Sequence, residues 1–184
     1  MMPSFAHTAV LTCHPETYTR AVQEIEVRVG WTQGNALAFT YAIKGNVMRL
    51  RIPLPRQPRR ADRLWQHTCF EAFVSVKGKT EYYEFNFAPS TRWAAYWFDS
   101  YRSGMRLATE ISAPRVEVQS SRACYRAALE MDQMSRLRID GKWWRIGLAA
   151  VIEETSGHKS YWALAHPPGK ADFHQSESFV LEFS

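Results

Sequence analysis

The sequence lacks the features that would place it in several common protein classes. Its 184 residues include only three cysteines, Cys13, Cys69 and Cys124, which are far apart and form no CxxC pair. Neither a zinc ribbon nor a thioredoxin-like motif is therefore available, and we expect reduced thiols. No apolar run approaches the roughly 20 residues that a membrane span needs, and the first residues do not read as a signal peptide. We expect a soluble, cytoplasmic protein with no membrane partner.

Catalytic and charge signatures are also scarce. The chain has no GxSxG, no HExxH and no Gly-rich phosphate loop. Its net charge of +5 is modest, and Lys and Arg are scattered, so we expect no nucleic-acid partner. Glu71 with Glu84 or Glu81 offers the two carboxylates of a glycoside hydrolase, but carboxylates are too common for that alone to indicate an enzyme. We expect a non-catalytic protein without a cofactor.

Aromatic residues, by contrast, are abundant. They make up 14% of the chain, with seven Trp, eight Tyr and ten Phe, and such enrichment favours strands. Short alternating runs recur between turn signals such as Gly34-Asn35 and Asp140-Gly141, and one such run is Met48 to Ile52. Almost no helical period is present. The pattern predicts an all-β fold, an antiparallel β-sandwich of about ten strands with little helix, as a single domain over residues 1–184.

The most informative segment is LWQHTCFEAFVSVKGKTEYYEFNFAP, residues 64–89, which predicts two strands joined by a tight turn. One face of the pair carries apolar residues at period two and predicts a core stripe. On the other face, a turn centred near Gly78-Lys79 places Glu71 opposite Asn86. Glu84 shares this face but lies nearer the turn, and we expect it to be exposed. A face with carboxylates, an amide and Trp65 suits a polar ligand that also has apolar surfaces, such as a sugar.

Four residues of this region are candidate ligand contacts, each with a structural alternative. The Trp65 ring is a flat plate for the C–H face of a pyranose, or it covers the end of the sandwich. Glu71 accepts from sugar hydroxyls, or it forms an ion pair with Arg92. Asn86 offers a donor and an acceptor to a hydroxyl, or it holds the turn that follows its strand. The Arg92 guanidinium binds ligand oxygens, or it is a solvated surface group.

A second unusual segment runs from Tyr161 to His174. A strand is expected to end at His166, and a rigid Pro-Pro-Gly turn leads to Asp172 and His174. Imidazole and carboxylate are competent metal ligands, but these three residues meet no sharp spacing rule. We therefore expect no metal, and a loop that folds over one edge of the sandwich with its histidines bonded to backbone.

The segments LWQHTCFEAFVSV…YYEFNFAPS and SYWALAHPPGKADFHQSESFVLEF resemble the DOMON-like superfamily, and within it bacterial stand-alone proteins related to family 9 carbohydrate-binding modules. The resemblance covers most of the chain and implies a β-sandwich with a ligand site on a concave face or at its rim. In the sugar-binding relatives, a Trp and a Glu at the spacing of Trp65 and Glu71 line that site, and Arg92 falls near a sugar-contacting arginine. Those relatives hold the sugar between two tryptophans. Here His166 or Phe173 stands nearest the place of the second.

The sequence thus predicts non-catalytic binding of a carbohydrate or similar small polar ligand on a concave sheet face. The predicted ligand-binding residues are Trp65, Glu71, Asn86, Arg92, His166 and His174. Two alternatives stay open. One is an interaction or scaffold protein with a degenerate ligand site. The other is a haem- or metal-binding redox module, although Met105 and the histidines do not match the haem-binding relatives.

Overall fold

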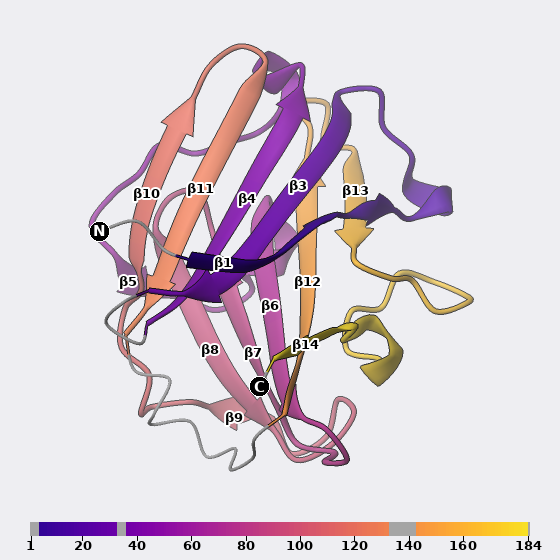
Figure 1. The fold of residues 1–184 in the computed structure, drawn as a ribbon. Coiled ribbons are helices and arrows are strands. Elements are labelled where there is room, and N and C mark those ends of the chain that lie inside the picture. The colour runs from indigo at the N-terminus through magenta and orange to yellow at the C-terminus, as the bar shows by residue number, and fades with distance from the viewer. Residues whose placement is uncertain (1–3, 33–35, 133–142, 184) are drawn as a thin grey trace.

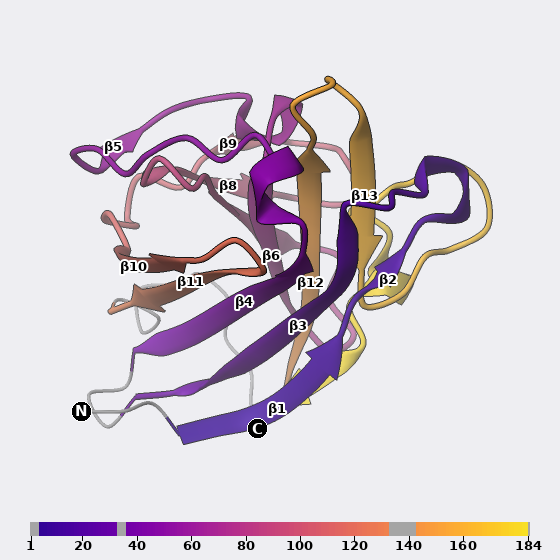
Figure 2. The same ribbon diagram turned by 90° about the horizontal axis from the view of Figure 1, so that it is seen from above.

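The computed structural model describes residues 4–32, 36–132 and 143–183, which form two β-sheets packed face to face (Figures 1 and 2). The smaller sheet has five strands in the order β1-β3-β4-β11-β10. Their bounds are β1 Ser4–Val10, β3 Val22–Trp31, β4 Leu37–Gly45, β10 Arg115–Ser120 and β11 Cys124–Met131. In Figure 1 this sheet lies in front of the larger one.

The larger sheet has nine strands. Seven follow the order β2-β13-β12-β6-β7-β8-β5, while β14 pairs with β12 and β9 with β8. Their bounds are β2 Thr12–Cys13, β5 Arg59–Arg60, β6 Cys69–Val76, β7 Tyr82–Phe87, β8 Arg92–Phe98, β9 Arg106–Leu107, β12 Trp144–Glu153, β13 Lys159–Ala163 and β14 Leu181–Phe183. Every strand pair is antiparallel except β5 with β8, so the predicted antiparallel β-sandwich is confirmed.

Helix is limited to short 3₁₀ turns in the part of the chain that the structure describes. They are η1 Pro15–Thr17, η2 Val47–Arg49, η3 Leu64–Gln66 and η5 Ser176–Ser178. None of the helices in the described ranges has the length and apolar character needed to cross a membrane.

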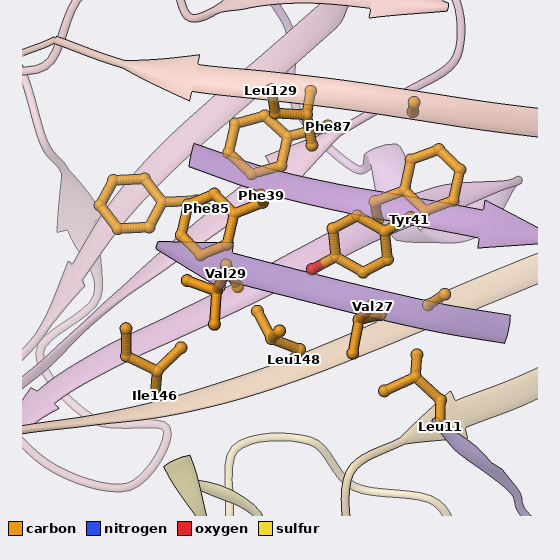
Figure 3. Packing of buried hydrophobic residues seen from close by; sticks show 14 of the residues in the cluster. Leu11, Val27, Val29, Phe39, Tyr41, Phe85, Phe87, Leu129, Ile146 and Leu148 are labelled. Atoms are coloured by element: carbon orange, nitrogen blue, oxygen red, sulfur yellow. The ribbon is translucent and has the colours of Figure 1, made fainter. Parts of the chain in front are cut away.

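The main core fills the space between the two sheets (Figure 3). Phe39 and Tyr41 of β4 face Phe85 and Phe87 of β7, and all four are at most 2% exposed. Removal of such side chains from water stabilises the fold by roughly 25 cal/mol per Å² of apolar surface. The buried Tyr41 hydroxyl donates to the backbone carbonyl of Glu71, at 2.7 Å. This hydrogen bond offsets the desolvation penalty of burying the hydroxyl in the core.

The opposite face of the larger sheet, here called the outer face, carries a second apolar cluster. Phe73 of β6 and Phe98 of β8 contribute to it, and Phe173 and Phe179 reach it from the chain between β13 and β14. A side chain at Gly147 of β12 would meet the Phe179 ring at 2.6 Å, so this close approach requires glycine. The segment that follows β13 therefore covers part of the outer face and leaves a hollow beside it.

The predicted hairpin of residues 64–89 is confirmed in its register. β6 and β7 pair with Glu71 opposite Asn86. The predicted strand from Met48 to Ile52 is wrong, because this segment forms η2 and then a single bridge at Leu50. The backbone amides of Arg49 and Leu50 donate to the carbonyls of Asn46 and Val47 within the 3₁₀ turn, so they form no strand ladder. The predicted turns at residues 34–35 and 140–141 lie outside the described residues.

Candidate ligand cavity on the outer face

A cavity of about 360 Å³ opens on the outer face of the larger sheet. Its lining comes from η3, from five strands, from the chain after β8 and from the chain after β13. The lining residues are Trp65, Glu71, Glu84, Tyr96, Phe98, Arg102, Met105, Val151, Tyr161, Ala171, Phe173 and His174. Its volume lies within the range of about 300–1,000 Å³ that small-molecule sites occupy. Five of the twelve lining residues are Trp, Tyr or Phe, and three are glutamates or arginine.

Two carboxyl groups form the base of the cavity. Glu71 of β6 is 3% exposed and Glu84 of β7 is 5% exposed, so the expectation that Glu84 is exposed is wrong. Glu84 is covered because the segment after β13 brings His174 to within 3.8 Å of its Oε2. Asn86 donates from Nδ2 to Glu84 Oε1 at 2.8 Å. Glu71 Oε1 and Asn86 Oδ1 are buried with no hydrogen-bond partner among the described residues.

Burial dominates the electrostatics of these carboxyls. Loss of hydration raises the pKa of Glu71 well above 4.5, and the nearby charge of Glu84 raises it further. Burial likewise raises the pKa of Glu84 to about 7, against the hydrogen bond from Asn86 and the charge of Arg102, which lower it. Burial and mutual repulsion therefore favour the protonated forms of these two carboxyls more than in exposed glutamates.

Aromatic side chains of contrasting burial make up the wall. Trp65 lies in η3 and stays 39% exposed, whereas Tyr96 and Phe173 are buried at 1% and 8%. The chain enters η3 through Arg63, whose φ of +57° is in the left-handed region. The Tyr96 hydroxyl donates to Asp62 at 2.7 Å, which anchors this ring. The site thus combines one accessible aromatic plate with a buried aromatic floor.

The cation of the cavity is Arg102, in the turn between β8 and β9. Its φ of +52° is in the left-handed region, which costs a non-glycine residue roughly 1–2 kcal/mol. Its backbone N–H donates to the Tyr82 hydroxyl at 3.2 Å. Its guanidinium donates from Nη2 and Nε to Asp172, at 2.8 and 3.4 Å. Arg102 therefore ties the β8–β9 turn to the segment that covers the sheet.

His174 lies at the boundary between the cavity and the outer apolar cluster. A hydrogen bond of 2.8 Å joins its Nδ1 to the Tyr82 hydroxyl, and its ring meets Phe73 and Phe98 edge-on. Burial and the charge of Arg102 lower the pKa of His174 to about 4. The imidazole is accordingly neutral near pH 7 and contributes no positive charge to Glu84.

Of the six predicted ligand-binding residues, the structure brings Trp65, Glu71 and His174 to the cavity, and Asn86 stands beside its base. Arg92 and His166 lie elsewhere. Arg92 begins β8, about 13 Å along the strand from Tyr96, and is not part of the lining. His166 has its Nε2 2.8 Å from the carbonyl oxygen of Thr12.

The three residues weighed as metal ligands have other partners. Asp172 binds Arg102, His174 binds Tyr82, and His166 binds backbone. In the described ranges no three His, Cys, Asp or Glu side chains are grouped closely enough to hold a metal ion.

Sequence reasoning missed Tyr96, Arg102 and Tyr161 as lining residues. Tyr96 could have been predicted to lie on the outer face. It is between core residues Ala95 and Trp97 in the expected strand over residues 93–99, and neighbouring residues of a strand lie on opposite faces. No local sequence pattern predicts the place of Arg102, because it depends on a left-handed turn and on a contact with Asp172, seventy residues further along the chain.

Comparison with known proteins places the fold. No protein-family model and no curated protein matches the sequence. The fold is similar to the crystal structure of a "putative carbohydrate-binding protein" from Bacteroides uniformis, with a TM-score of 0.64 and 16% identity over 94% of this chain and 84% of that one. It is also similar to a family 9 carbohydrate-binding module from Caldicellulosiruptor kristjanssonii in complex with cellotriose, with a TM-score of 0.53 and 14% identity over 94% and 80% of the two chains. At these identities the likeness concerns the fold.

Proposed function

We propose that the protein binds a saccharide, without catalysis, in the cavity on its outer face. The observation that carries this proposal is the buried Glu71 oxygen that lacks a partner at the base of an aromatic-walled cavity. An unsatisfied buried polar atom costs about 1–3 kcal/mol, so natural structures rarely keep one without a use. A sugar hydroxyl supplies the missing donor.

The wall of the cavity suits the rest of such a ligand. A pyranose presents C–H groups on its faces and hydroxyls on its edge. Trp65 offers an accessible ring for the C–H face, and Glu71, Glu84 and Arg102 offer acceptors and donors to the edge. The similarity in fold to a module seen in complex with cellotriose supports the same ligand class.

The test is isothermal titration calorimetry of the full chain with a panel of mono- and disaccharides. We expect one or more to bind, and Trp65→Ala to weaken that binding about tenfold or more, because the stacking surface is lost. Trp143→Ala is the matched control, since Trp143 is also exposed, at 53%, but does not line the cavity. It should bind like the wild type.

Three results would contradict the proposal. A flat titration across the whole panel would favour an interaction protein with a degenerate site. A Soret absorbance band in the purified protein would favour a haem module. Release of smaller sugars during incubation, followed by chromatography, would assign the Glu71–Glu84 pair to hydrolysis instead.

A further inference from the structure

The charges around the cavity do not balance. Glu71 and Glu84 are both buried at its base. The cation that lines it, Arg102, already forms an ion pair with Asp172, at 2.8 Å between Nη2 and Oδ1. His174 is neutral near pH 7, because burial and the charge of Arg102 lower its pKa to about 4. With both glutamates ionised, these groups sum to two uncompensated negative charges in a desolvated site.

The unsatisfied hydrogen-bonding groups at the base of the cavity also favour a positively charged ligand. With Glu71 ionised, its Oε1 and Asn86 Oδ1 are both acceptors, they belong to residues opposite one another across β6 and β7, and both are buried without a partner among the described residues. Glu84 Oε2 lies 3.8 Å from Nε2 of His174, which is too long for a hydrogen bond. The base of the cavity around the ionised pair therefore lacks both a donor for these oxygens and a positive charge of its own. An ammonium group supplies three donors, one positive charge and no acceptor.

We propose that the saccharide of this cavity is an amino sugar, whose protonated amine lies between Glu71 and Glu84. This inference rests on the proposed function and narrows its ligand class. A neutral sugar satisfies the orphan acceptors but leaves the carboxyls to stay protonated. An ammonium satisfies the acceptors and also stabilises both carboxylates. The aromatic wall favours the same ligand, since a cation over a ring face gains about 0.5–2 kcal/mol.

Other groups around the carboxyl pair do not change this balance. Cys69 and Tyr82 share the outer face with the pair, and Tyr41 lies behind Glu71 in the core between the sheets. The pKa of each is raised, chiefly by burial, so all three are neutral near pH 7. The pKa of the buried Tyr96 is raised by burial as well. The net charge of the whole chain is +5, which repels cations in general. A preference for an amine must therefore arise locally in the cavity.

The experiment compares three β-1,4-linked disaccharides by calorimetry near neutral pH: cellobiose, chitobiose with two free amines, and N,N′-diacetylchitobiose. They share a ring framework and differ in the substituent at carbon 2. We expect chitobiose to bind about tenfold or more tightly than both neutral sugars. Glu71→Gln should bring the three affinities within about twofold of one another. Glu182→Gln, which removes an exposed carboxylate outside the cavity, should keep the preference.

A second measurement needs no variant. Chitobiose should displace a proton from the carboxyl pair, which titration in two buffers of different ionisation enthalpy detects, and cellobiose should displace none. Equal affinity for the three sugars would overturn the amine inference and leave the proposed function standing. A preference that survives Glu71→Gln, or the absence of proton release, would overturn the amine inference in the same way. Failure of all three sugars and of the wider panel to bind would overturn both.

Discussion

Two pairs of glutamates are buried in the larger sheet, and they differ in what neutralises them. Glu153 and Glu154 stand at the end of β12, at 4% and 5% exposure. Glu153 lies 2.7 Å from His67 Nδ1 and 3.2 Å from Arg51. Glu154 lies 3.1 Å from Arg49 and accepts from a buried threonine hydroxyl. Every carboxyl of this pair has a cation or a donor of its own.

Glu71 and Glu84 in the cavity are equally buried but have fewer hydrogen-bond and ion-pair partners among the described residues. Glu84 accepts a single hydrogen bond, from Asn86, and Glu71 keeps a buried oxygen with no partner in the described chain. The nearby cation, Arg102, forms its ion pair with Asp172. The pair at Glu153 and Glu154 is completed by its own protein, whereas the pair beside the cavity is the one for which we propose a ligand. The two pairs therefore differ in charge compensation within one sheet.

The largest expected effect is on the pH dependence of stability. The pKa of Glu84 rises from 4.5 in the unfolded chain to about 7 in the folded one, and that of Glu71 rises as well, both chiefly through burial. The folded state then holds more protons between these values. The contribution of Glu84 to the free energy of unfolding should fall by about 3 kcal/mol as pH rises from about 4.5 to above 7, whereas the contribution of His174, whose pKa is lowered to about 4, rises over the lower part of this range. Urea denaturation across this range measures it.

The double variant Glu71→Gln/Glu84→Gln isolates the pair in that experiment. The difference in unfolding free energy between the wild type and this variant should follow the carboxyl pair, because neither amide titrates and both proteins contain His174. Curves that stay parallel to the wild type at every pH would show that the cavity carboxyls are compensated after all, which would remove the contrast with Glu153 and Glu154.

A smaller change in unfolding free energy is expected when a carboxyl of the other pair is removed. Glu154→Gln should destabilise the fold by about 2 kcal/mol near neutral pH, because it removes the charge that binds Arg49. Thermal or urea unfolding measures the change. Glu182→Gln is the control, since Glu182 is 43% exposed and pairs with Lys77 at the surface. If Glu154→Gln were neutral or stabilising, the description of this pair as structural would fail.

The smallest effect concerns Arg51. Its side chain is 55% exposed, and Glu153 keeps the hydrogen bond with His67 when the arginine is removed. Arg51→Ala should therefore cost only about 0.5 kcal/mol in unfolding free energy. A loss several times larger in urea denaturation would mean that Arg51, rather than His67, is the main partner of Glu153.

Much of the site's framework could be predicted from alternation. Period two along residues 69–76 and 82–87 separates core side chains from those of the outer face, and a short turn sets Glu71 opposite Asn86. The same logic failed for Glu84, because proximity to a turn does not reveal that a segment ninety residues later lies over it. Arg92, chosen because it follows the turn after the second strand and from the family resemblance, does not line the cavity, whereas Arg102 does.

The sequence by itself determined the β-sandwich, the core face of the β6–β7 pair and the presence of carboxyls on its opposite face, since these follow from local periodicity and turn chemistry. Tertiary structure alone decided that those carboxyls lie at the base of a cavity. Burial and charge balance depend on segments far apart in the chain, here η3, the β8–β9 turn and the residues after β13. Those neighbours decide whether a buried glutamate is neutralised by its own protein or is left without a partner, and no local sequence pattern encodes them.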